Sequence, residues 1–233
     1  MNGCTGGDVS VANETVIWLR PERAAVGRPA ERSRAEITSA AIALADREGL
    51  DAVSMRRVAA QLGTGAASLY RYVATRDDLL DLMTDATASE YELNEPGGDW
   101  RADLLTVARQ TRRIMRRHPW LPGLIATRPA LGPHAVDVLD RFLEFLADHP
   151  APAARKLEAF ALLNAVTAMI VQNESAATTV DTARSTAYLR HVAAAGTHPR
   201  ITAALVGTPV ADSTATTDPF DDAMARILDG LLG

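Results

Sequence analysis

Residues 54–80 read SMRRVAAQLGTGAASLYRYVATRDDLL, and this stretch decides the fold of the N-terminal part of the chain. Its first apolar residues recur at i, i+3, i+4 and i+7, which is the spacing of one buried helix face. They are Met55, Val58, Ala59 and Leu62. Ser54 is placed to cap this helix and Gly63 to end it, because glycine adopts the left-handed conformation at little cost. A second short helix is expected from about Ala66 to Tyr72, with Leu69 facing the first.

Two helices this short cannot bury enough surface alone, so they must share a core with neighbouring helices. A helix, a turn containing glycine and a second helix is the arrangement that places a recognition helix in the major groove of DNA. The outward positions of the second helix are Ala67, Ser68, Arg71 and Tyr72. Small side chains let a backbone approach base edges, and Arg or Tyr then reaches bases or phosphates. Three further arginines flank the helix, namely Arg56, Arg57 and Arg76.

The pattern of this stretch leaves an alternative open. A helical hairpin with a solvated face that carries arginines has the same spacing, because structural mimics of the DNA-binding arrangement are common.

Composition favours an all-helical protein. The chain has 233 residues, of which 47% are apolar and 5% aromatic, enough for a full core in one large domain or two small ones. No apolar run is long enough to span a membrane, and the N-terminus lacks the layout of a signal peptide, so a cytoplasmic location is expected. Cys4 is the single cysteine, which excludes an intramolecular disulfide.

Charge is distributed unevenly along the chain. The net charge is −5, yet residues 20–78 carry ten arginines against eight acidic residues. Residues 79–233 carry fourteen basic and nineteen acidic residues. Basic charge is therefore concentrated near the expected recognition helix, as phosphate contact requires. An excess of two charges is modest, so DNA affinity needs a dimer that places two such domains on one duplex.

Periodicity and breakers predict the remaining helices. One is expected over about 33–48, and another, capped by Thr75, over about 76–93. Further helices are expected near 100–117, 121–127, 134–147, 153–175 and 219–232. Residues 176–183 and 207–218 are expected to be mobile loops, and the start of the chain a flexible arm, although Val16–Leu19 is unusually apolar for a free tail.

Two helices of the C-terminal part carry large apolar surfaces. The helix near 153–175 is apolar nearly all round, so it must be covered on more than one side, by its own domain or by a partner subunit. The last helix carries one apolar face. The basic cluster Arg112–Arg117 ends another helix, where we expect it to compensate the helix dipole and face solvent.

The N-terminal stretch resembles the DNA-binding domain of the TetR (tetracycline repressor) family of transcriptional regulators over residues 33–80. The most specific part of the match is Leu69–Tyr70–x–Tyr72–Val73–x–x–Arg76–x–x–Leu79. The matching residues also include Ile37, Ala41, Leu44, Gly49, Ser68 and the Asp78–Leu79–Leu80 helix start. By this resemblance Ala66, Ala67, Ser68, Arg71 and Tyr72 face DNA, Tyr70 and Tyr72 contact phosphates through their hydroxyls, and Arg76 anchors the next helix on the DNA backbone.

The resemblance implies three parts. Residues 1–32 form a flexible arm, 33–80 a three-helix helix-turn-helix domain, and 81–233 a helical domain for ligand binding and dimerisation. In the family two C-terminal helices of each subunit pair in a four-helix dimer interface. The residues so implied are Leu157, Val166, Ile170, Phe220, Met224, Ile227, Leu228 and Leu231.

The body after Trp100 resembles the tetracycline-repressor branch through Arg117–His118–Pro119–Trp120–Leu121 and Thr127–Arg128–Pro129. That branch holds magnesium–tetracycline with histidines, whereas the corresponding positions here are Glu92 and Leu124, so the resemblance does not extend to that ligand. A helical body with this lining instead suits a largely hydrophobic small molecule. Candidate lining residues are Met83, Ile114, Trp120, Leu124, Phe142, Phe160, Asn164 and Gln172. For each of them singly, plain core is the competing interpretation.

No catalytic or cofactor motif is found. The histidines lack metal-ligand spacing, and phosphate-binding loops and a nucleophile elbow are missing, so we expect no metal, no cofactor and no enzyme activity. The sequence therefore predicts an all-α, homodimeric repressor that binds a palindromic DNA operator and is released by a small effector. The alternatives are a helical small-molecule binding protein or enzyme with a merely structural helix-turn-helix, and an activator without a ligand.

Overall fold

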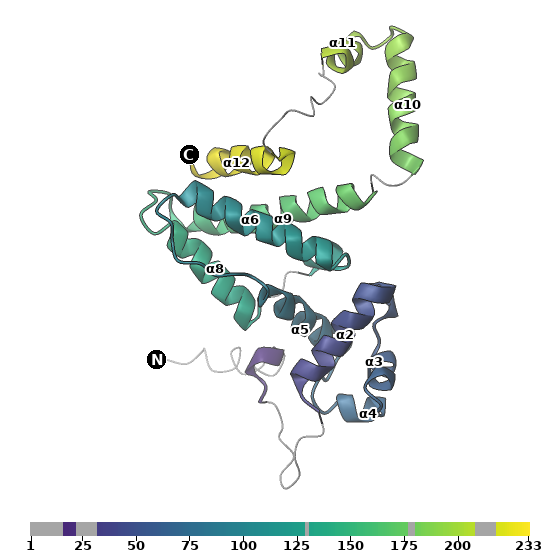
Figure 1. Ribbon diagram of the computed structural model, residues 1–233, viewed down its shortest axis with the longest axis vertical. Coiled ribbons are helices and arrows are strands. Elements are labelled where there is room, and N and C mark those ends of the chain that lie inside the picture. The colour runs from purple at the N-terminus through teal and green to yellow at the C-terminus, as the bar shows by residue number, and fades with distance from the viewer. Residues whose placement is uncertain (1–15, 22–31, 129–130, 177–179, 208–217) are drawn as a thin grey trace, which may run out of the picture.

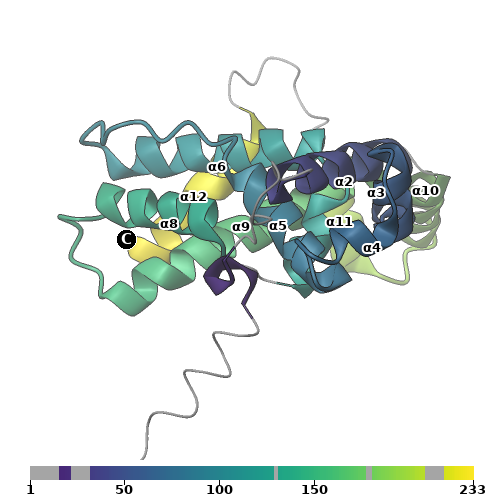
Figure 2. The same ribbon diagram turned by 90° about the horizontal axis from the view of Figure 1, so that it is seen from below.

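The computed structural model describes residues 16–21, 32–128, 131–176, 180–207 and 218–233, and every regular element among them is a helix. Figure 1 shows a small N-terminal head, a larger body and the helix α5 between them. We call α2, α3 and α4 the head, and α6–α9 with α12 the body. Seen from below in Figure 2, the head helices gather at one end and the body helices at the other. None of the described helices is both long and apolar enough to cross a lipid bilayer.

The head is built on α2 (Arg34–Glu48), followed by the 3-10 turn η2 (Leu50–Ala52), α3 (Met55–Gln61) and α4 (Ala66–Leu69). The hydroxyl of Ser33 accepts a hydrogen bond from the Glu36 amide at 3.1 Å, and the Glu36 carboxylate accepts one from the Ser33 amide at 2.8 Å. This capping box fixes the start of α2. The apolar positions expected to be buried are buried except Leu62, which is half-buried, and Ile37, Ala41, Val58 and Leu69 are fully enclosed.

The helix α5 (Arg76–Ala88) also begins with a capping box, between Thr75 and Asp78. It is shorter than the predicted 76–93. The amides of Ser89, Glu90 and Tyr91 bond to carbonyls three residues back instead of four, and the α-helix ends there. Beyond it the Gln110 side chain accepts from the Glu92 amide at 2.7 Å and donates to the Glu92 carbonyl at 3.1 Å. A side chain from α6 thus takes the place of helical partners, so Glu92 does not lie on a helix.

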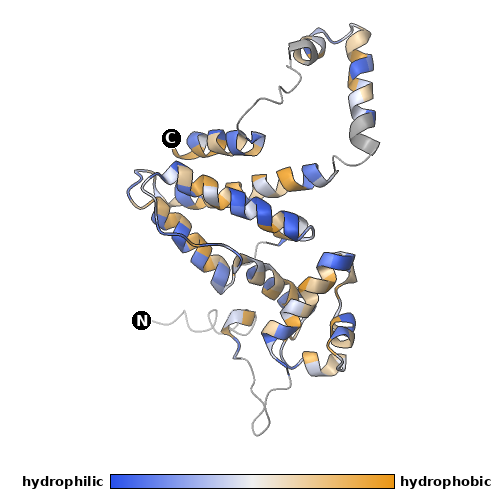
Figure 3. Ribbon diagram, viewed as in Figure 1, coloured by the Kyte–Doolittle hydropathy of each residue, from blue (hydrophilic) through white to orange (hydrophobic). Residues whose placement is uncertain are grey.

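The body consists of α6 (Trp100–Arg117), α7 (Leu121–Thr127), α8 (Pro133–Phe145), α9 (Ala153–Ala176) and α12 (Pro219–Leu232). Its core is centred on Leu104, Phe142, Leu163 and Met224, which are fully buried. Figure 3 shows the C-terminal half of α6 as strongly hydrophilic. The arginines there are paired with carboxylates, among them Arg116 with Glu174 at 2.8 Å. Arg113, Arg116 and Arg117 are exposed as expected, whereas the Arg112 side chain is only 14% exposed.

The helices α10 (Val180–Ala194) and α11 (Pro199–Gly207) pack on each other and project from the body in Figure 1. The prediction of a loop over 176–183 is therefore wrong from Val180 onward. The predicted loop over 207–218 lies almost wholly outside the described residues. The remaining helices of the body lie within two residues of the predicted bounds.

The segment Val16–Pro21, which the sequence assigns to a flexible arm, is packed against the protein. It contains the 3-10 turn η1 (Ile17–Leu19), and the Ile17 side chain is 2% exposed. The turn lies against α5, and Ile17 belongs to the same core cluster as α2. Burial thus explains the apolar character of Ile17 and, in part, of Trp18, whereas Val16 and Leu19 are exposed.

Candidate functional site

The two short helices of the head form the expected helix-turn-helix. The Ser54 hydroxyl caps α3 by accepting from the Arg57 amide at 3.3 Å. Gly63 has a φ of +66°, the left-handed conformation that glycine favours. The Thr64 amide then bonds to the Ala59 carbonyl at 2.9 Å and turns the chain toward α4. Leu69 is fully buried and holds α4 on the rest of the head.

Most residues expected to face DNA are exposed on the surface of the head. Arg56, Ala67, Tyr70 and Arg71 are exposed, and the Tyr70 side chain is 52% accessible. Ala66 and Ser68 are half-buried at the start of α4. The Ser68 hydroxyl contacts Thr64 Oγ1 and the Gly65 carbonyl, each at 2.8 Å, so it rigidifies the turn.

Two of the flanking arginines also have structural partners. Arg57 forms an ion pair with Glu48, and this contact, followed by that of Arg47, holds the pKa of Glu48 below its ordinary value. Arg76 donates to the carbonyls of Val53 at 3.3 Å and Leu50 at 3.4 Å. Arg76 therefore ties the start of α5 to the turn before α3.

Tyr72 differs from the prediction. The second helix ends at Leu69, three residues earlier than expected, and the chain turns so that Tyr72 is 7% exposed. The Tyr72 carbonyl accepts from Arg34 Nε at 3.1 Å. The prediction that Tyr72 is an outward residue of the second helix is wrong, because the turn after α4 carries its side chain into the head.

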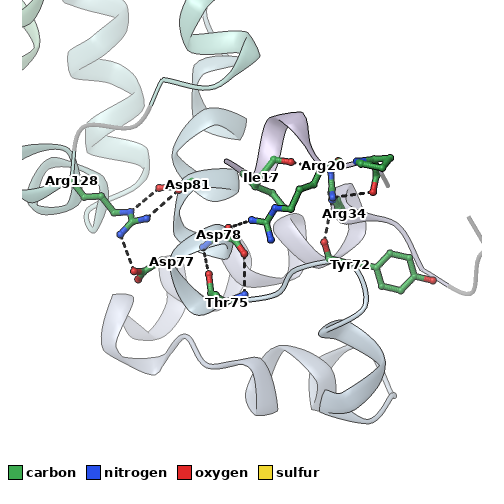
Figure 4. Close-up of polar contacts among 10 residues, drawn as sticks. Ile17, Arg20, Arg34, Tyr72, Thr75, Asp77, Asp78, Asp81 and Arg128 are labelled. Carbon is green, nitrogen blue, oxygen red and sulfur yellow. Dashed lines mark hydrogen bonds and ion pairs between the residues drawn. The ribbon is translucent and has the colours of Figure 1, made fainter. Parts of the chain in front are cut away.

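Two polar junctions connect the head and α5 to the body. In the first, Arg128 at the end of α7 contacts Asp81 at 2.7 Å and Asp77 at 3.1 Å on α5 (Figure 4). Hydrogen bonding to Asp81, the largest cause, raises the pKa of Arg128 above its ordinary value, so the guanidinium stays charged. This fork–carboxylate pair fixes α7 on α5.

In the second junction, His118 bonds to carboxylates on both sides. Its Nδ1 lies 2.8 Å from Asp46 on α2, and its Nε2 lies 2.8 Å from Glu90 just after α5. Trp120 donates its indole N–H to the same Asp46 oxygen at 2.7 Å. The His118 side chain is 5% exposed, whereas the Asp46 and Glu90 side chains keep partial access to solvent, and the junction ties the end of α6 to the head.

The N-terminal segment forms a third connection (Figure 4). Arg20 forms an ion pair with Asp78, and Arg34 donates to the Arg20 carbonyl at 2.8 Å. Trp18 reaches the body, since a methyl group built on Gly132 would lie 2.6 Å from Trp18 Cζ2. One short segment thus contacts α2, α5 and the start of α8.

A cavity of about 360 Å³ is enclosed by α5 together with the body helices α6, α7, α8 and α9. It is lined by Thr84, Thr87, Ala88, Tyr91, Thr111, Ile114, Met115, Leu121, Ile125, Ala126, Leu131, Ala135, Val138, Phe160, Ala161, Asn164 and Ala165. A volume of this size suits a small organic molecule. Within the described part of the chain, no group of three or more His, Cys, Asp or Glu side chains could hold a metal ion.

The sequence identifies part of this lining. Ile114, Phe160 and Asn164 line the cavity, whereas Met83, Trp120, Leu124, Phe142 and Gln172 do not. The first four of these are core residues, and Gln172 is exposed on α9. The lining residues that sequence reasoning misses include Thr84 and Thr87, which lie three residues apart on α5, and Tyr91, which follows the end of that helix. Polar residues recurring on an otherwise apolar helix face are the signal that could have found them.

The residues expected at a dimer interface fall into two groups. Phe220, Met224 and Leu228 are no more than 3% exposed, because α12 packs on α6 and α9 of the same chain. Their assignment to a contact between subunits is wrong for this chain. Leu157 is 46% exposed, and Val166, Ile170, Ile227 and Leu231 are half-buried, so these five keep accessible surface.

Two family profiles match the chain. The one described as bacterial regulatory proteins, tetR family, matches residues 37–83, and the one described as Tetracyclin repressor-like, C-terminal domain, matches residues 92–233. The HTH-type transcriptional repressor DrrR1 of Streptomyces coeruleorubidus is 42% identical over 142 residues, which make up 60% of this chain and 52% of that protein. The chain spans about half the length of the curated relatives that it matches.

The fold is shared with ActR of Streptomyces coelicolor. Its apo crystal structure is 30% identical with a TM-score of 0.73, and it covers 86% of this chain and 97% of its own. The structure of ActR in complex with actinorhodin is 29% identical, with the same TM-score and the same coverage. With a helix-turn-helix head, a helical body and profiles that match both, the chain belongs to the TetR family of bacterial transcriptional regulators.

Proposed function

We propose that this protein is a ligand-responsive repressor that binds a palindromic DNA operator as a homodimer and is released by a small, largely apolar molecule. The observation that carries the proposal is the sharing of α5 between the two functional parts. The start of α5 is held to the head through Arg76, and its C-terminal half contributes Thr84 and Thr87 to the cavity. A molecule in the cavity therefore touches an element that also positions the head.

The same arrangement supports a route for release. Both polar junctions lie at ends of helices that line the cavity, with His118 following α6 and Arg128 following α7. A ligand that fits better when these helix ends are shifted favours a second position of the heads, by as much as its difference in affinity between the two states. Heads in that position no longer match two successive major grooves.

The homodimer is supported by accessible apolar surface on the body. Leu157 and Met169 on α9 are 46% and 56% exposed, and α10 exposes Tyr188 at 67% and Leu189 at 42%. A pair of helices that is exposed almost all round, as α10 and α11 are, needs a further surface to pack against. A second copy of the chain, seated on the free sides of α9 and α12, would supply it.

Relatives add to the proposal in two ways. DrrR1 is named a transcriptional repressor, and ActR has been crystallised with actinorhodin. By analogy the cavity here is the effector site, and Arg56, Arg57, Ala66, Ala67, Ser68, Tyr70, Arg71 and Arg76 contact the operator. A protein that binds chromosomal DNA is expected to reside in the cytoplasm.

Selection of bound sequences from a random duplex DNA pool, at low and at physiological salt, tests the proposal. Enrichment of a palindrome is expected, and the selected duplex then serves in a screen for compounds that release it. Lack of any enrichment at both salts would refute operator binding and favour a helical binding protein or enzyme. A duplex that binds but that no cavity-filling compound releases would favour an activator or repressor without an effector.

A further inference from the structure

Most polar side chains of the cavity share one property, namely that the hydroxyl proton of each is already used in a hydrogen bond within the protein. Five polar side chains line it, Thr84, Thr87, Tyr91, Thr111 and Asn164, and among the described lining residues none carries a charge. A ligand can only pair with what these groups still offer. Their remaining capacity therefore indicates what kind of ligand the cavity recognises.

The three threonines donate to backbone carbonyls. Thr84 Oγ1 donates to the Leu80 carbonyl at 3.0 Å, and Thr87 Oγ1 donates to the Thr84 carbonyl at 2.7 Å. Thr111 Oγ1 donates to the Val107 carbonyl at 2.9 Å. A hydroxyl has one proton, so each of these oxygens is left only with lone pairs that accept hydrogen bonds.

The use of the Thr111 proton decides the direction of a fourth bond. The Tyr91 hydroxyl lies 2.7 Å from Thr111 Oγ1. Both contacts of Thr111 Oγ1 are satisfied at once only when Tyr91 donates and Thr111 accepts, because the Val107 carbonyl can only accept. Burial raises the pKa of Tyr91 to about 12, so the phenol keeps its proton at physiological pH. Its oxygen too can then only accept from a ligand.

Asn164 retains a mixed capacity. Its Nδ2 lies 2.9 Å from the Phe160 carbonyl, and a carbonyl accepts only, so the amide N–H₂ group faces it. One N–H is thereby used, while the Oδ1 atom and a second N–H remain. Asn164 is accordingly the one lining side chain among those described that can still donate.

We infer that the cavity selects an uncharged, largely apolar molecule through hydroxyl or N–H groups of the ligand, which donate to the Tyr91 and threonine oxygens. A ligand rich in carbonyl or ether oxygens would face these acceptors with acceptors and leave the buried oxygens of Thr84, Thr87 and Thr111 without a hydrogen bond from the ligand, which costs binding free energy. A carboxylate would lose its hydration without a cationic partner. The inference rests on the proposed role of the cavity as the effector site.

Binding of three matched probes to the full-length protein, measured by calorimetry, tests this inference. The probes are 2,6-dihydroxynaphthalene, its dimethyl ether, and naphthalene-2,6-dicarboxylate, which share one ring system. We expect the diol to bind about 10-fold more tightly than the more apolar ether, since each neutral hydrogen bond contributes about 2- to 10-fold. We expect no binding of the dicarboxylate. Equal affinities, preference for the ether, or lack of binding by all three would overturn the inference.

Two variants test the direction of the bonds. Thr111→Val removes the acceptor of the Tyr91 proton, so Tyr91 becomes able to donate to a ligand and the ether should gain affinity relative to the diol. Tyr91→Phe should weaken the diol by about 2- to 10-fold and leave the ether unchanged. Thr106→Val is the matched control, because Thr106 makes the same kind of bond to Ala102 at 2.9 Å but is exposed and does not line the cavity. An unchanged diol preference in both cavity variants would contradict the inference.

The inference and the proposed function can fail separately. A protein that prefers the diol but enriches no DNA sequence would keep the inference and refute the repressor. A protein that enriches a palindrome but prefers the ether would refute the inference and keep the proposed repressor.

Discussion

At the scale of single residues, the head presents two arginines that differ from their neighbours in having few competing partners. Arg56 is exposed and makes no hydrogen bond or ion pair among the described residues, and Arg71 makes only a long contact of 3.5 Å to the Ser68 carbonyl. Arg57 and Arg76, in contrast, have structural partners. An effect on DNA binding and an effect on the fold are therefore easiest to separate at Arg56 and Arg71.

Replacement of Arg71 or Arg56 by alanine should weaken binding to the selected duplex and lower the slope of log affinity against log salt by about one for each phosphate that is no longer neutralised. The thermal midpoint should not change. Fluorescence anisotropy titrations at several salt concentrations measure the slope. Arg155→Ala, a change to an exposed arginine on α9, is the control. A slope equal to that of the unaltered protein would show that these arginines do not face the phosphates.

Gly132 lies where neighbouring side chains leave no room for a larger residue. A methyl group there would lie 2.5 Å from Asp85 Oδ1 and 2.6 Å from Trp18 Cζ2. Asp85 is buried and accepts from the Ala135 amide at 3.0 Å, so it cannot move without uncapping α8. Gly132→Ala should therefore lower the free energy of unfolding by about 1–3 kcal/mol, measured by urea denaturation.

Gly123→Ala provides the matched comparison. Gly123 lies inside α7, where a methyl group would meet only Gln172 Nε2 at 3.7 Å. Replacement of a helical glycine with free space around it stabilises by about 0.4–1 kcal/mol. If both alanine variants had the same stability, the packing of Trp18 and Asp85 around Gly132 would be incorrect.

At the scale of the elements, the contact of α2 with the end of α6 depends on one carboxylate. Asp46 accepts from both His118 and Trp120, and the His118 ring is almost fully buried. Asp46→Ala leaves both groups without that acceptor, so we expect a decrease of about 1–3 kcal/mol in the free energy of unfolding. We also expect the effector to bind as before but to release operator less effectively, because the helix end would no longer act on the head.

Titration of operator affinity at saturating effector, together with direct effector binding, separates these two effects. Asp51→Ala is the control, since Asp51 is an exposed residue of the turn η2 in the same head. Full release by the effector in the Asp46→Ala variant would argue that coupling runs through the Arg128 junction instead.

The elements also show what the sequence can predict. Helix starts are predictable because caps are local: Ser33, Ser54 and Thr75 each bond within three residues. Helix ends that distant residues determine are not. The early end of α5 depends on Gln110 from α6, and the burial of Tyr72 depends on a turn whose direction is fixed by the rest of the head. The helix α10 escapes prediction because its sequence is polar and small, with no apolar stripe to mark it.

The cavity shows the same division between local and distant information. Phe160 and Asn164 are identifiable as lining residues because a large ring and an amide within an apolar helix need partners. The same argument assigns Phe142 to the lining, yet it packs edge-on against Phe160 and is fully buried. A sequence indicates the face of a helix, whereas the depth of a residue on that face depends on the helices that cover it.

At the scale of the whole molecule, the proposed dimer predicts opposite outcomes for two aspartate substitutions. Leu157→Asp places a charge on the exposed side of α9 and should convert the dimer to a folded monomer, observed by sedimentation equilibrium. Met224→Asp places a charge in the core of the chain itself, where Met224 is 0% exposed, and should prevent stable folding. A Leu157→Asp protein that stays dimeric would move the interface to another surface.

The stability of the fold at acidic pH should depend on one cluster of charged side chains. In it, Arg112 and Arg116 of α6 pair with Glu174 of α9, and Arg112 also pairs with Asp218 at the start of α12. Burial raises the pKa of Glu174, but hydrogen bonds from Arg112 and Arg116 outweigh it and hold the pKa below the ordinary 4.5. The Phe220 amide and then Arg112, at 2.6 Å, hold the pKa of Asp218 below 3.8. Both carboxylates thus bind protons less readily when folded, so they stabilise the fold above those values and lose this effect as the pH falls through the lower folded-state pKa values.

The thermal midpoint should accordingly fall between about pH 5 and pH 3, and Glu174→Gln should flatten part of that fall. The contribution is expected to be modest, about 1 kcal/mol or less, because the Glu174 side chain is partly exposed. Differential scanning calorimetry at several pH values measures it. Glu158→Gln, on the same helix and paired among the described residues only with Arg155 at the surface, should keep the full pH dependence. An equal dependence in both variants would assign the acid sensitivity elsewhere.

The packed segment at Val16–Pro21 has a consequence for how such a regulator responds. It lies upstream of the region matched by the family profiles. It nevertheless contacts α5, the helix between the head and the body, and the start of α8 beside the cavity. On the proposed function, mutations in these six residues are expected to alter the effector concentration that releases the operator without changing any side chain of the cavity or any residue proposed to contact DNA. A chain trimmed to residues 37–233, which the family profiles span, is therefore expected to lose these contacts and to respond differently from the full-length protein.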